Sequence, residues 1–264
     1  MIRTLALLLG SLFVTTSTNA EKPVLALVID DLGYSFELAK QVLNLPGKHT
    51  FAIIPDTTYD KKIAEFAHQN GHEIMLHMPM QSLASGKNIE TSTLDESMSE
   101  DEITSNVDYM LKEIPYIQGI NNHMGSKLTG MGYIMRPIME SIKKFNGKLY
   151  FLDSRTTALS QAYQQALRAR VPSLKRDIFL DYDHTNPESI SFQYQLWLDK
   201  ASKNGSAIAI AHPYSSTIEL LKEKLTQISS DYQFMTLSQL INYQQQEKTT
   251  WPRYLSHLQK DLKN

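Results

Sequence analysis

The sequence contains no cysteine among its 264 residues. This absence excludes disulfide bonds, thiol catalysis, thiolate zinc sites and iron–sulfur clusters. Any metal site must therefore be built from histidine and carboxylate side chains. A chain of this length buries enough apolar surface to be stable without disulfides, so the absence does not argue against export.

The chain also lacks an excess of charge of either sign. Its 26 basic and 28 acidic residues give a net charge of −2. Nucleic-acid binding typically needs a basic surface, so no nucleic-acid partner is expected. Beyond the N-terminus, the chain also lacks an apolar run of the roughly 20 residues that cross a bilayer as a helix.

The first 20 residues have the layout of a secretory signal peptide. Arg3 supplies a positive charge, residues 5–14 form an apolar segment, and residues 18–20 form a small-residue cleavage site. An uncleaved anchor is the alternative, but the apolar segment is about half as long as a spanning helix requires. We therefore predict an exported protein whose mature chain begins near residue 21 and has no membrane span.

The mature chain alternates between strand-like and helix-like segments. Residues 24–29 form a continuous apolar run, as in a strand buried on both faces, and residues 36–43 have helical spacing. Further strands are expected at 50–54, 73–77, 119–122, 149–152, 177–180, 207–211 and 234–236, and further helices at 59–69, 101–113, 133–145, 160–169, 187–202, 216–228 and 237–246.

This alternation predicts an α/β protein with a parallel sheet. With seven or eight strands, a distorted (β/α)7-8 barrel is favoured over an open sheet. We expect one barrel domain over residues 21–247, followed by a helical tail at 248–264, and the sequence indicates no second domain.

Acidic and imidazole groups occur where the predicted strands end. The carboxyl ends of parallel strands lie on one face of a barrel, so these groups are expected to converge there. His49, His68 and His257 are interpreted instead as surface or helix residues. The groups at strand ends are Asp30, Asp31, His77, His123, Asp153, Asp181, Asp183 and His212.

Five of these groups suffice for a metal-dependent hydrolase. Asp31, His77 and His123 can hold one divalent ion, with zinc expected, and leave positions open for water and substrate. Asp30 can remove a proton from the attacking water, and His212 can protonate the leaving group.

Several motifs resemble those of NodB-type polysaccharide deacetylases. The pair Asp30-Asp31 resembles the paired aspartates of that family, in which the first is the general base and the second a metal ligand. Residues 71–77 (GHEIMLH) resemble a segment whose last histidine binds metal. His212, at the end of IAH, resembles the catalytic acid.

The resemblance is closer to the divergent polysaccharide deacetylase branch and extends from about residue 24 to residue 240. The motifs of that branch resemble IDDLG (29–33), LHMPM (76–80), NNHMGS (121–126), FLDSRT (151–156) and AHP (211–213). One position departs from the wider family, since Gln81 stands where typical members carry a second metal histidine. His123 is predicted to take its place.

Four further residues are predicted to support the site or contact substrate: Asp153, Arg155, His72 and Asn122. Arg155 can orient Asp30, Asp153 or the substrate, or form an internal ion pair with Asp153. His72 is expected to shape the strand entry or orient a neighbour rather than bind metal. Asp181 and Asp183 are expected to shape a loop and cap the next helix.

The resemblance implies hydrolytic removal of N-acetyl groups from a cell-envelope or extracellular glycan, with the periplasm as the expected location. Gln81 motivates an alternative. In this alternative the protein is a catalytically weak or inactive glycan-binding or regulatory protein of the periplasm that retains the deacetylase barrel. A metal-dependent hydrolase of phosphoester or peptide bonds is a third reading. The sequence predicts no particular protein partner.

Overall fold

The computed structural model describes residues 21–84, 90–228 and 230–246. The predicted signal peptide and the tail at 248–264 therefore lie outside the described residues. Within them, parallel strands alternate with helices, which confirms the predicted (β/α) organisation. None of the helices in this part of the chain has the length and apolar character needed to cross a membrane.

Apart from β6, which was not predicted, the strands and the α-helices lie close to their predicted positions. The strands are β1 (Val24–Leu32), β2 (Thr50–Ile53), β3 (Glu73–Met80), β4 (Ile117–Met124), β5 (Tyr150–Asp153), β6 (Ser173–Lys175), β7 (Ile178–Phe179), β8 (Ser206–Ala211) and β9 (Gln233–Phe234). The helices are α1 (Phe36–Leu43), α2 (Asp60–Gln69), α3 (Glu100–Glu113), α4 (Gly132–Asn146), α5 (Ala162–Ala169), α6 (Pro187–Asn204) and α7 (Ser215–Gln227), with a 3-10 turn at Leu128–Gly130 and a further helix at 237–246.

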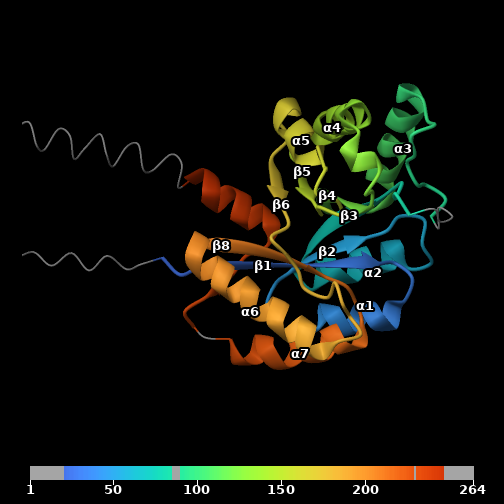
Figure 1. Ribbon diagram of the computed structural model, residues 1–264. Helices are drawn as coiled ribbons and strands as arrows, with labels where there is room; N and C mark the ends of the chain where they lie inside the picture. The colour runs from blue at the N-terminus through green and yellow to red at the C-terminus, as the bar shows by residue number, and fades with distance from the viewer. Residues whose placement is uncertain (1–20, 85–89, 229, 247–264) are drawn as a thin grey trace, which may run out of the picture.

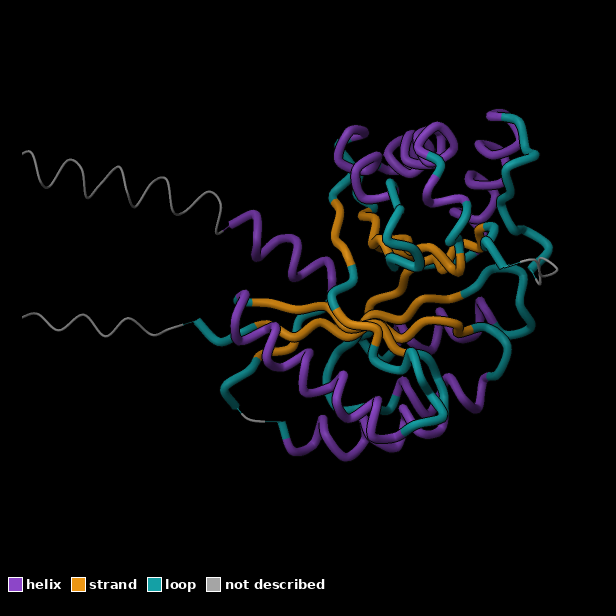
Figure 2. The backbone as a smooth tube through the Cα atoms, viewed as in Figure 1, coloured by secondary structure: helices purple, strands orange, loops and turns teal. Residues whose placement is uncertain are grey.

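The sheet is a barrel that stays open at one place. Its strand order is β6-β5-β4-β3-β2-β1-β8-β7, with β9 paired to β1, and all of these pairs are parallel. Among the described strands, β6 and β7 do not pair with each other, and we call the gap between them the seam. Figures 1 and 2 show the curled sheet with helices on its outer side. The predicted distorted barrel is confirmed.

Alternation along β1 explains how a carboxylate enters the barrel. Val24, Ala26 and Val28 belong to the apolar cluster inside the barrel, whereas the intervening residues pack in the cluster between the sheet and its helices. Since side chains alternate along a strand, Asp30 is the next to point inward. The inner cluster thus ends in a polar layer at the carboxyl ends of the strands.

A buried carboxylate organises the opposite end of the barrel. Glu73 accepts hydrogen bonds from the Thr50 hydroxyl at 3.0 Å and the Tyr150 hydroxyl at 2.6 Å. It also accepts from the backbone N–H of Ser238 at 3.2 Å, in the first turn of helix 237–246. This negative charge suits a helix N-terminus, and it ties the last described helix to three strands.

His49 was interpreted as a surface or helix residue, and this interpretation is wrong because it is buried and lies in no helix. Its side chain is fully buried, with Nε2 bonded to the carbonyl of Pro46 at 2.8 Å. Burial is the main cause that lowers the pKa of His49, to about 4. The imidazole is therefore neutral in the folded protein at neutral pH.

This buried imidazole predicts a loss of stability on acidification. The folded pKa lies below the ordinary value, so the unfolded chain binds the proton more readily and stability falls as the pH drops from about 6.5 towards 4. Between pH 7.5 and pH 5 the free energy of unfolding of the native protein should fall by about 2 kcal/mol more than that of the His49→Gln variant. Glutamine keeps a hydrogen-bond donor for the Pro46 carbonyl. Urea unfolding at both pH values measures this, and equal losses would contradict it.

Candidate functional site

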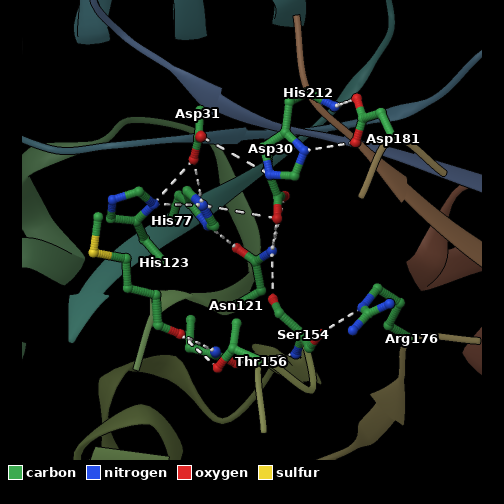
Figure 3. Close-up of polar contacts among 12 residues, drawn as sticks. Asp30, Asp31, His77, Asn121, His123, Ser154, Thr156, Arg176, Asp181 and His212 are labelled. Atoms are coloured by element: carbon green, nitrogen blue, oxygen red, sulfur yellow. Dashed lines mark hydrogen bonds and ion pairs between the residues drawn. The ribbon is translucent and has the colours of Figure 1, made fainter. Parts of the chain in front are cut away.

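Most of the predicted site residues meet in one cavity at the carboxyl ends of the strands, and Figure 3 shows Asp30, Asp31, His77, His123 and His212 there. The cavity has a volume of about 190 Å³. Six of the nine residues predicted for the site line it: Asp30, Asp31, His77, Asn122, His123 and His212. Met124, Ser154, Thr156, Arg176, Phe179 and Ile210 complete the lining.

Three predicted ligands converge at a spacing that suits a metal ion. His77 Nε2 lies 3.0 Å and His123 Nδ1 lies 2.9 Å from Asp31 Oδ1, and the two nitrogens are 3.2 Å apart. Ligands held about 2.0–2.2 Å from a metal, at angles of 90–110°, are separated by roughly 3.0–3.5 Å. The Asp31, His77 and His123 side chains are thus a candidate metal centre.

The hydrogen bonds around His77 set its tautomer so that Nε2 can bind a cation. Asn121 donates its amide N–H groups to the Asp30 carboxylate at 2.9 and 3.1 Å, so its Oδ1 is the atom that faces His77 Nδ1, at 2.7 Å. His77 must then carry its proton on Nδ1, which leaves the Nε2 lone pair directed at Asp31. A positive ion between these atoms relieves the repulsion of lone pairs, and the donor set therefore fits a metal.

A local backbone distortion turns Asp31 into the site. Strict alternation would point Asp31 away from the barrel, since Asp30 points in. Asp31 instead has a φ of +59°, and the pairing of β1 with β2 shifts register between Ile29 and Leu32. This bulge lets consecutive carboxylates share one cavity. Positive φ values also occur at Met124 (+51°), the last residue of β4, and at Arg155 (+51°), after β5.

The two aspartates have opposite electrostatic environments. Burial raises the pKa of Asp30, although His77 and His212 nearby act in the other direction. Burial also opposes ionisation of Asp31, but the adjacent imidazoles of His123 and His77 outweigh it and hold the pKa of Asp31 well below its ordinary value. Asp31 is therefore suited to remain an anionic ligand, while Asp30 is suited to exchange a proton.

His212 enters the cavity from the end of β8 and is held by Asp181. The Asp181 carboxylate accepts from His212 Nδ1 at 2.9 Å and from the His212 backbone N–H at 2.7 Å. Burial lowers the pKa of His212, but Asp181, Asp31 and Asp30 outweigh it and raise the pKa to about 9. Asp181 was predicted only to shape a loop and cap a helix, which misses this role as the partner of His212.

The arginine in the cavity is Arg176, which the sequence did not single out. Its guanidinium donates to the backbone carbonyl of Arg155 at 2.8 Å and stacks over Phe179, 4.9 Å from the ring centre. The Arg155 side chain is exposed and lines a neighbouring hollow instead. Arg176 follows β6, a strand that the sequence pattern did not predict, so the pattern placed only Arg155 after a strand end.

Asp153 and Asn122 support the site by fixing the loops that follow β4 and β5. Asp153 is buried and accepts from the Arg155 N–H and the Ser160 hydroxyl, both at 2.8 Å, so it fixes the loop after β5 rather than pairing with the Arg155 side chain. Asn122 accepts from the Ser154 N–H at 3.0 Å and donates to the Met124 carbonyl at 2.8 Å.

His72 does not belong to the site. It precedes β3, at the end of the strand opposite to His77, where its ring bonds to the Leu43 carbonyl at 3.0 Å and faces the His49 N–H at 3.4 Å. The expectation that it shapes the strand entry agrees with these contacts, but its inclusion among the supporting site residues was wrong.

Gln81 and Glu90 complete the surroundings of the candidate metal centre. The Gln81 side chain accepts from the Glu96 N–H at 3.0 Å and does not line the cavity. Glu90 lies 3.4 Å from His123 Nε2 and accepts from the Tyr34 hydroxyl at 2.9 Å. A carboxylate next to the outer nitrogen of a histidine is a common support for a metal ligand, and no sequence pattern indicated this role for Glu90.

Fold and site together define a parallel (β/α) barrel protein with a candidate metal centre at the carboxyl ends of its strands. The chain belongs to the divergent polysaccharide deacetylase family, whose model matches residues 27–241.

Two relatives and one solved structure extend this result. The chain is 38% identical over 229 residues to the uncharacterised protein YibQ of Escherichia coli (strain K12), covering 87% of this chain and 70% of that protein. It is 35% identical over 225 residues to an uncharacterised protein of Haemophilus influenzae, covering 85% and 79%. The crystal structure of the uncharacterised protein ATU2773 from Agrobacterium tumefaciens C58 shares the fold, with a TM-score of 0.78, 22% identity and coverage of 84% and 91%.

Proposed function

We propose that this protein is a metal-dependent hydrolase that removes N-acetyl groups from a cell-envelope or extracellular glycan. The observation that carries the proposal is the single cavity in which three convergent ligands lie beside Asp30 and His212. Membership of the divergent polysaccharide deacetylase family supports the same class of reaction.

The three ligands are two imidazoles and a carboxylate, a set that favours zinc once the imidazoles have lost their extra proton. Zinc bound there would lower the pKa of a water ligand towards ~7 and polarise the acyl carbonyl. The chain's own residues must then move two protons, one away from the attacking water and one onto the departing amine.

Asp30 is placed to take the first proton. Its Oδ2 lies 3.7 Å from His77 Nε2, so the carboxylate borders the ligand cluster without joining it. Burial raises its pKa, which makes it a stronger base than an exposed aspartate. The two hydrogen bonds from Asn121 fix the carboxylate in this position.

His212 is placed to give the second proton. Asp181 bonds to Nδ1, so Nε2 is the nitrogen that faces the cavity, 3.9 Å from Asp31 Oδ2. With a pKa raised to about 9, the ring is protonated at neutral pH and can protonate the amine nitrogen as the C–N bond breaks.

The role of Asp181 predicts a change in pH dependence. The acid must be protonated to act, so activity should fall as the pH rises through the pKa of His212. Asp181→Asn removes a charge that raises this pKa, so the alkaline limb of the kcat/KM profile should move to lower pH. Asp183→Asn, in the same loop, is the matched control and should leave the limb in place. An unmoved limb in Asp181→Asn would argue against His212 as the acid.

The direct test of the function is acetate release. Purified protein loaded with zinc should release acetate from N-acetylglucosamine oligomers, and removing the metal with a chelator should stop it. Saturable glycan binding without acetate release, with metal fully bound, would instead favour a glycan-binding or regulatory protein. Gln81 motivates that alternative, although its side chain is already engaged by the Glu96 N–H.

We also propose that the protein is exported, with the periplasm as its location. The charged, apolar and small-residue segments of the first 20 residues support this proposal. Cell fractionation and N-terminal sequencing test it. A protein that stays in the cytoplasm with residues 1–20 intact would refute it.

A further inference from the structure

Two further hollows adjoin the catalytic cavity on the side of Arg176. Arg176 lines both this cavity and a second hollow of about 230 Å³, whose walls also include Arg155 and Asp177. A third hollow of about 160 Å³ shares Arg155 with the second and includes Lys175 and Tyr163. We call these two neighbouring hollows the seam groove, because they lie beside the gap between β6 and β7.

The open barrel explains the composition of this groove. β6 ends at Lys175 and β7 begins at Ile178, so Arg176 and Asp177 form the short connection across the seam. Arg155 follows the end of β5, which pairs with β6, and its left-handed backbone, with a φ of +51°, makes a sharp turn there. Three cationic side chains are thereby brought to one side of the catalytic cavity.

The cations of the seam groove form no close ion pair in the described part of the chain, although the charges of Asp30, Asp153 and Asp177 act on Arg176. Within the described ranges, Arg155, Lys175 and Arg176 form no ion pair with a carboxylate. Arg176 instead donates to the backbone carbonyl of Arg155, and the Lys175 ammonium lies 4.8 Å from the ring centre of Tyr163. Arginine and lysine at such positions keep donors available for a ligand.

The acidic residues of the groove are committed elsewhere. Asp153 accepts from the Arg155 N–H and the Ser160 hydroxyl, both at 2.8 Å. Asp177 accepts from the Ile208 N–H at 2.9 Å and pairs with Lys200 at 3.3 Å. Because Lys200 offsets Asp177, the three cations face the single remaining charge of Asp153, and the groove carries an excess of positive charge beside the catalytic cavity although the whole chain is slightly acidic.

We propose that the seam groove binds an anionic substituent, a carboxylate or a phosphate, on the glycan unit next to the acylated sugar. This inference rests on the proposed function and names its substrate class, an anionic rather than a neutral N-acetylated glycan. The planar guanidinium of Arg155 suits such oxyanions because it can form two parallel hydrogen bonds to them. Arg176 lies where the groove meets the catalytic cavity and thus links the two subsites.

The test compares the binding of matched probes to the zinc-loaded full mature chain at low salt. Chitotetraose is the neutral probe, and a hyaluronan tetrasaccharide, in which N-acetylglucosamine alternates with glucuronate, carries carboxylates. A charged hydrogen bond contributes about 1.5–3 kcal/mol, so the hyaluronan probe should bind at least about tenfold more tightly.

A second comparison, of the dissociation constants of N-acetylglucosamine 1-phosphate and N-acetylglucosamine, distinguishes phosphate from carboxylate as the preferred anion. Added salt should reduce the preference.

Two variants assign the preference to the groove. Arg155→Gln and Lys175→Gln should each bring the ratio of the two dissociation constants closer to one, by about threefold to tenfold. Lys222→Gln, an exposed lysine on α7, removes the same charge away from the seam and should leave the ratio unchanged.

The inference is overturned if neither anionic probe binds more tightly than its neutral counterpart, or if Arg155→Gln and Lys175→Gln keep the native ratio. Acetate release, measured separately, decides the proposed function. Preference for an anionic probe without acetate release would preserve the groove and refute the hydrolase. Acetate release without such a preference would support the hydrolase and refute the role of the groove.

Discussion

Replacing His123 with alanine is expected to remove the metal from the purified protein. His123 Nδ1 lies within 3.2 Å of both other ligand atoms, so its loss leaves only two protein ligands. Loss of an outer partner of a metal ligand already weakens binding by roughly 10–100-fold, and loss of a ligand itself should exceed this. Elemental analysis after zinc loading and desalting measures the effect, with Asp31→Ala expected to behave in the same way.

Gln81→Ala provides the control for this experiment. Gln81 occupies the position of the usual second histidine, but its side chain bonds to the Glu96 N–H instead of facing the ligands. Its replacement should leave the metal content unchanged. A native metal content in His123→Ala, or a loss in Gln81→Ala, would show that the ligand set is assigned wrongly.

Replacing Asp30 with asparagine is expected to abolish turnover while leaving the metal in place. Asparagine is nearly isosteric and can still accept from Asn121, but it cannot take a proton. General-base catalysis contributes about 10²–10⁴-fold, so kcat for acetate release should fall by that factor. Initial rates of acetate release, with metal content measured on the same samples, test this prediction.

The metal measurement makes this second result interpretable. Asp30 does not belong to the ligand cluster, although its Oδ2 lies 3.7 Å from His77 Nε2. If Asp30→Asn loses its metal, the side chain acts as a ligand or as structural support. If it keeps both metal and full activity, another group is the base.

The sequence predicted the barrel and most of the site because both depend on strand periodicity. The run at residues 24–29 predicted a buried strand, and groups at strand ends predicted a shared face. Strand β6 was missed because three residues, Ser173–Lys175, are too few to show a period. The turn of Asp31 into the cavity was equally hidden, since it depends on a bulge rather than on residue type.

The residues that the sequence did not assign to the site act through partners distant in the chain. Asn121 is recognisable only when Asp30 and His77 are seen on either side of its amide. Asp181 became the partner of His212 only through the pairing of β7 with β8. Such roles need the strand order, which the residues of a single strand do not contain.

The buried Glu73 carboxylate has a consequence for the order in which the chain folds. It accepts from Thr50 and Tyr150 on the strands, but also from the backbone of Ser238, close to the end of the described chain. Until Ser238 is in place, this charge lacks part of its hydrogen bonding in an apolar interior, a costly state. The barrel should therefore reach its native stability only when the helix at 237–246 has docked, and a chain truncated before Ser238 should stay sensitive to protease.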